Sequence, residues 1–130
     1  MGLKYYLTVK NNFIYKQLRK NRVVKFSCEQ SDKNTARYAL TEDGTTLATV
    51  ETEGDTIKSV SFCNKSAENM YRDFTLRSAV FLLREKFPQV KAAFTDPLLE
   101  VLGFVPYENG MKADSIKIRF DNCCHGGCNK

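Results

Sequence analysis

Apolar and polar residues alternate with a period of two through the middle of the chain, between residues 36 and 62. The alternation falls into three runs rich in β-forming residues: 36–40, 47–50 and 57–62. The dipeptides Asp43-Gly44 and Gly54-Asp55 separate these runs, and both are typical of β-hairpin turns. The pattern therefore predicts a three-stranded antiparallel meander with one covered face.

After this region the apolar spacing changes to that of a helix. One face of the next segment carries Leu76, Val80, Leu83 and Phe87, and the opposite face carries Arg77, Arg84 and Glu85. The spacing predicts a long amphipathic helix over 69–87, preceded by a polar break at 63–68 and ended by Pro88.

Two signals predict a second, very short helix after residue 95. Asp96 is a favourable N-cap, and Pro97 follows at the first helical position, where the missing N–H of proline is tolerated. Gly103 is suited to end this helix. Three short strands are expected around it, at 90–94, 104–107 and 115–120, and a loop at 108–114 joins the last two.

A helix that connects two strands of one sheet is a crossover, so the strands at 57–62 and 90–94 are expected to be parallel neighbours. The predicted fold class is therefore α+β, with an antiparallel meander, a β-α-β crossover and a central mixed sheet.

Residues 1–35 form a basic N-terminal segment with a less regular pattern. We expect a strand at 3–9, a short basic helix at 12–21, a strand at 23–28 and a polar turn at 29–34. Every charged residue before Glu29 is Lys or Arg, although the whole chain has a net charge of only +5. Such a segment is usually a solvated face, but it also suits the phosphates of nucleic acid or a nucleotide cofactor.

The composition is that of an ordinary globular protein. The chain has 130 residues, of which 42% are hydrophobic and 27% charged, so we expect one soluble domain over 1–130. No apolar run approaches the roughly 18 residues that a membrane span needs, and the first residues lack the apolar core of a secretion signal. These features predict a cytoplasmic protein without membrane contact.

The order of the elements, with Leu102-Gly103-Phe104 ending the very short helix, resembles the GNAT superfamily of acyl-CoA-dependent N-acetyltransferases. The resemblance covers residues 36–120, which would be the core of the domain. It implies binding of acetyl-CoA and transfer of the acetyl group to an amine of a small molecule or a protein. In that family the N-terminus of the long helix holds the cofactor pyrophosphate, since free N–H groups and the helix dipole favour anions.

In an alignment with the family's pyrophosphate-binding motif, the matching residues of this sequence run from Arg72 to Arg77. The resemblance therefore implies that Arg72 and the backbone near Leu76 to Ser78 contact the pyrophosphate. The full set of implied cofactor-binding residues is Phe62, Cys63, Arg72, Thr75, Leu76, Arg77 and Ser78.

Three residues are candidates for the chemistry of such a transfer. Glu51 is the candidate base for the amine, with Glu53 as the alternative. Tyr107 is the candidate acid for the departing thiolate, with Tyr71 as the alternative. Cys63 follows the last meander strand and is a candidate nucleophile if its thiol ionises.

The last ten residues, 121–130, form a tail rich in ligands for soft metals. Within six positions it contains Cys123, Cys124, His125 and Cys128. This spacing predicts part of a site for zinc or another thiophilic metal, to be completed by Cys28, Cys63, a second subunit or water. A reversible disulfide or a tail of reduced thiols remains an alternative.

Two other functions remain open. In the first alternative, the chain is a non-catalytic module on the same scaffold that binds an acyl-CoA, a metal or a partner protein. In the second it binds nucleic acid through the basic segment, in which four aromatic residues able to stack on bases are interleaved: Tyr5, Tyr6, Phe13 and Tyr15.

Overall fold

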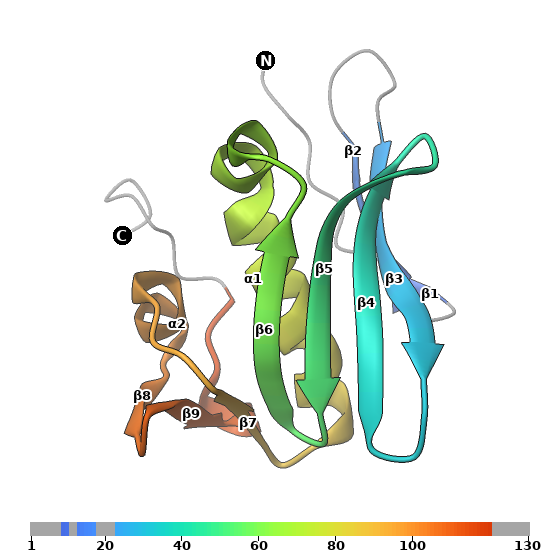
Figure 1. Ribbon diagram of the computed structural model, residues 1–130. Helices are drawn as coiled ribbons and strands as arrows, with labels where there is room; N and C mark the ends of the chain where they lie inside the picture. The colour runs from blue at the N-terminus through green and yellow to red at the C-terminus, as the bar shows by residue number, and fades with distance from the viewer. Residues whose placement is uncertain (1–8, 11–12, 18–22, 121–130) are drawn as a thin grey trace.

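One mixed β-sheet and two α-helices make up most of the described chain (Figure 1). The structure, a computed structural model, describes residues 9–10, 13–17 and 23–120, with side chains from Val24 onward. Its strands are β1 (Val9–Lys10), β2 (Phe13–Gln17), β3 (Val23–Ser31), β4 (Thr35–Glu42), β5 (Thr45–Glu53), β6 (Thr56–Phe62), β7 (Gln89–Ala92), β8 (Val105–Tyr107) and β9 (Gly110–Asp114). Its helices are α1 (Lys65–Lys86), α2 (Pro97–Leu102) and a 3-10 helix (Ser115–Lys117). The fold class is α+β, as predicted.

The strands lie in the order β1-β2-β3-β4-β5-β6-β7-β9-β8. Each described pair of neighbours is antiparallel except β6 and β7, which are parallel. The chain crosses from β6 to β7 through α1, so the predicted crossover between parallel neighbours is confirmed.

The meander of β4, β5 and β6 follows the predicted turns. Asp43 and Gly44 have φ angles of 51° and 81°, and Gly54 has 58°, which is the left-handed backbone that tight hairpins require. The strands are longer than the alternating runs, because backbone pairing continues past the last buried side chain. The polar turn expected at 29–34 is too long for this reason, since β3 continues to Ser31.

The long helix begins earlier than the apolar spacing indicates. Asn64 is its N-cap, and the Asn64 Oδ1 accepts a hydrogen bond of 2.8 Å from the N–H of Ala67. The expected polar break at 63–68 is therefore wrong, since helix α1 starts at Lys65. It ends at Lys86, one residue earlier than predicted, with Phe87 as its C-cap before Pro88.

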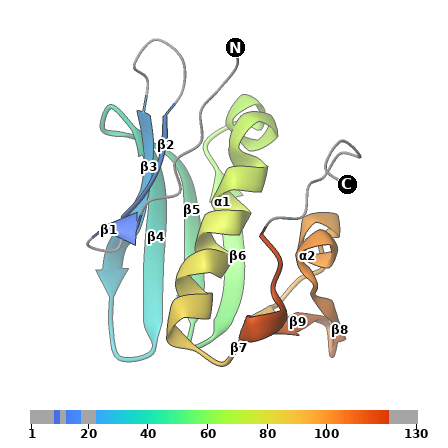
Figure 2. The ribbon, with the colours of Figure 1, turned by 180° about the vertical axis from the view of Figure 1, so that it is seen from behind.

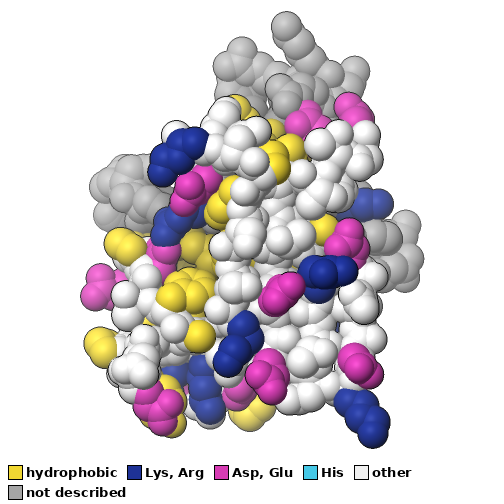
Figure 3. All heavy atoms as spheres, in the orientation of Figure 1, with side chains coloured by type: hydrophobic (Ala, Val, Ile, Leu, Met, Phe, Trp, Pro, Cys, Tyr) yellow, Lys and Arg dark blue, Asp and Glu magenta, His cyan; other side chains and the backbone are white. Residues whose placement is uncertain are grey.

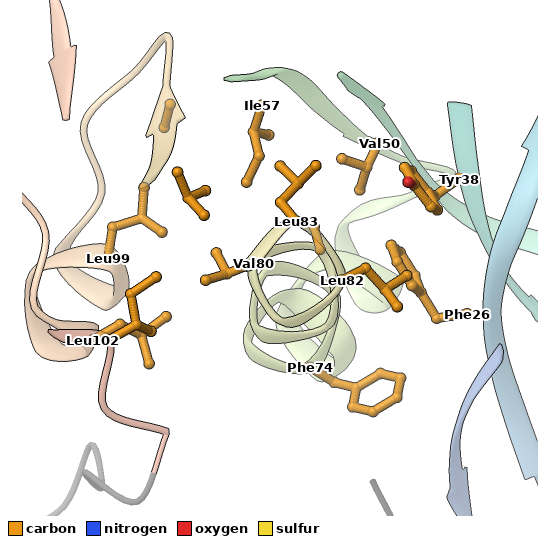
Figure 4. Packing of buried hydrophobic residues seen from close by; sticks show 14 of the residues in the cluster. Phe26, Tyr38, Val50, Ile57, Phe74, Val80, Leu82, Leu83, Leu99 and Leu102 are labelled. Atoms are coloured by element: carbon orange, nitrogen blue, oxygen red, sulfur yellow. The ribbon is translucent and has the colours of Figure 1, made fainter. Parts of the chain in front are cut away.

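Helix α1 covers one face of the sheet, as the view from behind shows (Figure 2). In Figure 4, Leu82 and Leu83 point toward the sheet while Val80 points toward α2. The partners labelled there are Phe26, Tyr38, Val50 and Ile57 of the sheet and Leu99 and Leu102 of α2. One continuous core thus fixes α1 against both the meander and the C-terminal elements. Neither α1 nor α2 combines the length and apolar character that a membrane crossing needs.

The caps of α2 are those predicted. Asp96 Oδ1 accepts a hydrogen bond of 2.9 Å from the N–H of Leu98, and Pro97 occupies the first turn. Gly103 ends the helix with a φ of 112°.

Three other predictions about the elements are wrong. Residues 13–17 of the expected helix at 12–21 form strand β2, because they pair with β3 from Val23 to Ser27. The expected loop at 108–114 contains strand β9, and the expected strand at 115–120 begins instead as a 3-10 helix. Gly110 explains why the strand that pairs with β7 lies at 110–114 and not at 115–120. A Cβ at this position would overlap the carbonyl of Ala92, so only glycine lets β9 approach β7 here.

Candidate functional site

The parallel strands β6 and β7 separate soon after they pair. Their register consists of Thr56 with Lys91 and Ile57 with Ala92, and Ile57 O also accepts from Ala93 N at 2.9 Å. Strand β6 then continues to Phe62 without β7 beside it, and the two strands diverge in Figure 1. A groove therefore opens at the carboxyl ends of the two strands, where α/β sheets commonly hold ligands.

The groove has a volume of about 210 Å³ and three kinds of wall. Strand β6 contributes Val60 and Phe62, α1 contributes Glu68, Arg72 and Leu76, and the segment after β7 contributes Phe94 and Asp96. Hydrophobic side chains come to the surface beside β6 in Figure 3, whereas the face over β4 and β5 is largely polar. The groove thus combines apolar walls with a few charged groups, as ligand sites usually do.

The edge of β6 that borders the groove carries backbone polar groups. Cys63 donates its N–H to Leu47 O at 2.9 Å, so this residue faces β5. Because backbone groups alternate between the two edges of a strand, the N–H and C=O of Val60 and Phe62 face away from β5, toward the groove. An extended ligand with amide groups can pair with such an edge.

Arg72 and Asp96 form an ion pair at the groove. The Asp96 side chain is only 5% exposed, and its Oδ2 pairs with Arg72 Nη2 while its Oδ1 caps α2. The Arg72 side chain remains 40% exposed. Asp96 therefore fixes one edge of the guanidinium and leaves other donors of that group accessible to an anion.

A second hollow of about 320 Å³ lies between α1 and α2. Its lining consists of Arg72, Asp73, Pro97, Leu98 and Val101. Arg72 lines both hollows, so they adjoin at its side chain and together can hold a ligand longer than either one.

Some of the predicted cofactor-binding residues meet in the groove and others do not. Phe62, Arg72 and Leu76 line it, and Cys63 follows directly after Phe62 as an exposed thiol. Thr75 and Ser78 are fully buried inside α1. Arg77 turns elsewhere, because it pairs with Asp73 and donates to the carbonyl of Phe120 at 3.3 Å.

Free N–H groups are not found near residues 76–78, where they were expected. Those residues lie in the interior of α1, where backbone N–H groups bond within the helix. At the true N-terminus, Asn64 already accepts from the N–H groups of Ala67 and Glu68, at 2.8 and 3.1 Å. The acidic side chain of Glu68 also lies there, 3.4 Å from Lys65 Nζ, and it weakens the attraction of this helix end for an anion.

The three candidate catalytic residues are not brought together. Glu51 lines a separate hollow of about 410 Å³ on the face of the sheet away from α1, directly opposite Arg37 in the strand register. Tyr107 lies in edge strand β8, with its ring beside the ammonium group of Lys112. Cys63 alone is adjacent to the groove, and neither Glu51 nor Tyr107 lines it.

Four of the residues that line the groove were not predicted as site residues: Val60, Glu68, Phe94 and Asp96. The N-cap signal identified Asp96, but only for its role in α2. The partner of its second oxygen, Arg72, is distant in the sequence, and no local pattern indicates such a pair.

The four tail ligands Cys123, Cys124, His125 and Cys128 lie outside the described residues, so their predicted metal site stays a prediction. Within the described ranges, no three His, Cys, Asp or Glu side chains are grouped to hold a metal ion. Cys28 and Cys63, the other possible ligands, are both exposed there as free thiols.

Comparison of the chain with protein-family models, curated proteins and solved structures found no match.

Proposed function

We propose that the protein binds an acyl-CoA in the groove between β6 and β7 and transfers its acyl group to an amine. The observation that carries this proposal is the separation of β6 from β7 after two residue pairs, which leaves a groove with apolar walls and an unshared strand edge. The pantetheine arm of coenzyme A is extended and contains two amides, which match the backbone groups of Val60 and Phe62. The thioester supplies the acyl group for attack by the amine.

The order of elements supports the same proposal. A meander, a long helix, a parallel strand, a very short helix and two antiparallel strands follow one another, and the short helix ends at Leu102 and Gly103 before Phe104. This is the order on which the resemblance to the GNAT superfamily rests. Arg72 is the proposed contact for the negatively charged part of the cofactor, because it is accessible where the two hollows adjoin.

Calorimetric titration with acetyl-CoA, combined with thermal unfolding, tests the binding step. We expect saturable heat and a higher unfolding temperature, since a ligand at about 100 times its Kd stabilises the folded state by about 2.7 kcal/mol. Val60→Trp fills the groove and should abolish both effects. Ile116→Trp makes a comparable change at a residue that is 93% exposed, so it should leave binding intact. Absence of heat and of stabilisation at millimolar acetyl-CoA would refute the proposal.

A second candidate is a non-catalytic module that binds acyl-CoA. The specific observation in its favour is that neither Glu51 nor Tyr107 lines the groove. Mass spectrometry of an amine panel incubated with protein and acetyl-CoA separates the two functions. Acylated amine above the uncatalysed level supports the transferase, whereas tight binding without product supports the module.

A further inference from the structure

Strands β7 and β9 bring two lysines together on the face of the sheet that the helices do not cover. Lys91 and Lys112 are directly opposite each other in the antiparallel register. The residues on either side of each lysine are buried in the core: Val90, Ala92, Met111 and Ala113. Because side chains alternate along a strand, both lysines project to the other face, and like charges in this arrangement repel each other.

The ring of Tyr107, on neighbouring strand β8, lies beside both ammonium groups. Its centroid is 4.3 Å from Lys112 Nζ and 5.7 Å from Lys91 Nζ. A cation within about 6 Å of an aromatic centroid is attracted by the ring quadrupole, which offsets part of the repulsion. The ring has no net charge, however, so two positive charges remain at this place.

Neither lysine lies within 4.0 Å of a carboxylate in the part of the chain that the structure describes. Other lysines do have such partners: Lys58 Nζ is 3.8 Å from Glu53, and Lys117 Nζ is 3.9 Å from Asp114. Asp114, the acidic residue of β9, is thus already paired with Lys117. An excess of positive charge therefore gathers at Lys91 and Lys112.

The backbones that carry the two lysines are held close. Gly110 packs against Ala92 so tightly that no Cβ fits between β9 and β7. Gly110 is also the register partner of Tyr107, which fixes the hairpin that carries the ring. The backbones and the hairpin that carry these side chains are therefore positioned before any ligand binds, so that binding has to order only the lysine side chains.

We propose that Lys91, Lys112 and Tyr107 form a binding site for the phosphate group of a small phosphomonoester. A phosphate carries nearly two negative charges at neutral pH and has several acceptor oxygens, so it can accept from both ammonium groups at once. Val105 is opposite Lys112 and 54% exposed, so it offers an apolar contact for the organic part of the ester. The inference does not rest on the proposed function, since the side chains that line the groove project to the opposite face.

The test is a titration of isotopically labelled protein with inorganic phosphate, followed by the amide resonances at constant ionic strength and pH. We expect saturable shifts at Lys91, Tyr107 and Lys112. Lys91→Gln and Lys112→Gln should each weaken binding about tenfold, as the loss of a charge-assisted hydrogen bond predicts. Lys117→Gln, which removes a lysine that has its own carboxylate, should leave the affinity unchanged. Phenyl phosphate in a parallel titration separates the sources. Tighter binding than that of free phosphate supports an ester held by Val105, and equal or weaker binding would overturn the ester as the ligand.

Shifts that grow without saturation, or that persist in both glutamine variants, would overturn the site. Thermal unfolding provides the control for folding. Relief of the repulsion predicts that both variants unfold at the wild-type temperature or above it. A clear fall in both would show that the lysines stabilise the fold through other contacts, and it would also overturn the inference.

Discussion

Arg72 and Asp96 give a quantitative test of the groove, because the two partners differ so much in exposure. The Asp96 side chain is 5% exposed and the Arg72 side chain 40%. Removing Arg72 leaves a buried carboxylate without its cation. Removing Asp96 leaves a guanidinium that water can reach.

The expected cost of Arg72→Ala is about 2 kcal/mol of unfolding free energy. Breaking a fully buried pair costs about 3–5 kcal/mol. The value is lower here, because the Leu98 N–H still serves Asp96 Oδ1 and water enters beside the shortened side chain. Asp96→Ala is expected to cost about 2 kcal/mol as well, of which about 1 kcal/mol is the lost cap of α2. In the Asp96→Ala background, Arg72→Ala should cost almost nothing.

Urea unfolding of the wild type, both single variants and the double variant measures this coupling directly. At about 4 °C per kcal/mol, the Arg72→Ala variant should also melt about 8 °C lower than the wild type. Lys65→Ala is the matched control, since its side chain is 79% exposed and its pairing with Glu68 is expected to contribute less than about 0.5 kcal/mol. Equal costs of Arg72→Ala in both backgrounds would refute the ion pair as the source of the effect.

Three further predictions concern other parts of the chain. Gly110→Ala should lower the urea midpoint more than Gly44→Ala. The methyl group at position 110 would overlap the carbonyl of Ala92, at a cost of about 1–3 kcal/mol, whereas the methyl group at position 44 would meet no atom and would add only the strain of a positive φ. A larger effect of Gly44→Ala would contradict the close approach of β9 to β7. Asn64→Ala should cost about 1 kcal/mol in thermal unfolding through loss of the N-cap of α1, whereas Asn64→Asp should retain most of the stability, and equal losses would argue against this cap. For the tail we propose a thiophilic metal, so untagged protein should contain zinc or copper by mass spectrometry and Cys124→Ser should reduce the content; absence of metal from both samples would dismiss the site.

The strongest local patterns of the sequence predicted their elements well. Asp96, Pro97 and Gly103 gave both ends of α2, because capping depends on a few neighbouring residues. The interior of α1 near Leu83 was equally clear, since its apolar residues recur at helical spacing over several turns. In each case the information lies within one or two turns of chain.

Elements that depend on distant partners were harder to predict. The residues from Phe13 to Gln17 form a strand only because β3 pairs with them, and the basic helical pattern of that stretch gave no sign of it. A strand was expected at 115–120, but residues 110–114 pair with β7 instead, as strand β9. Asn64 was available as a cap signal, yet the weakly apolar first turn of α1 concealed the start of the helix.

The candidate site shows the same limit. Its walls come from residues 60–62, 68–76 and 94–96, which become neighbours only through the crossover. The resemblance led to Phe62, Arg72 and Leu76, but the residues from Leu76 to Ser78, where free N–H groups were expected, lie in the interior of α1. Only the first turn of a helix has N–H groups without a partner inside the helix, so the position of that turn decides where an anion can be bound.

The junction of β6 and β7 also has a consequence for how the molecule opens. Only two residue pairs join β6 to β7, and the part of the sheet made of β7, β9 and β8 contains only strands of three to five residues. Such a part is expected to open as one cooperative unit, with hydrogen exchange of its amides faster than that of the meander. Val80 of α1 points toward Leu99 and Leu102 of α2 within the shared core, so we expect truncation of Val80 to make this opening, and with it a widening of the groove, more frequent.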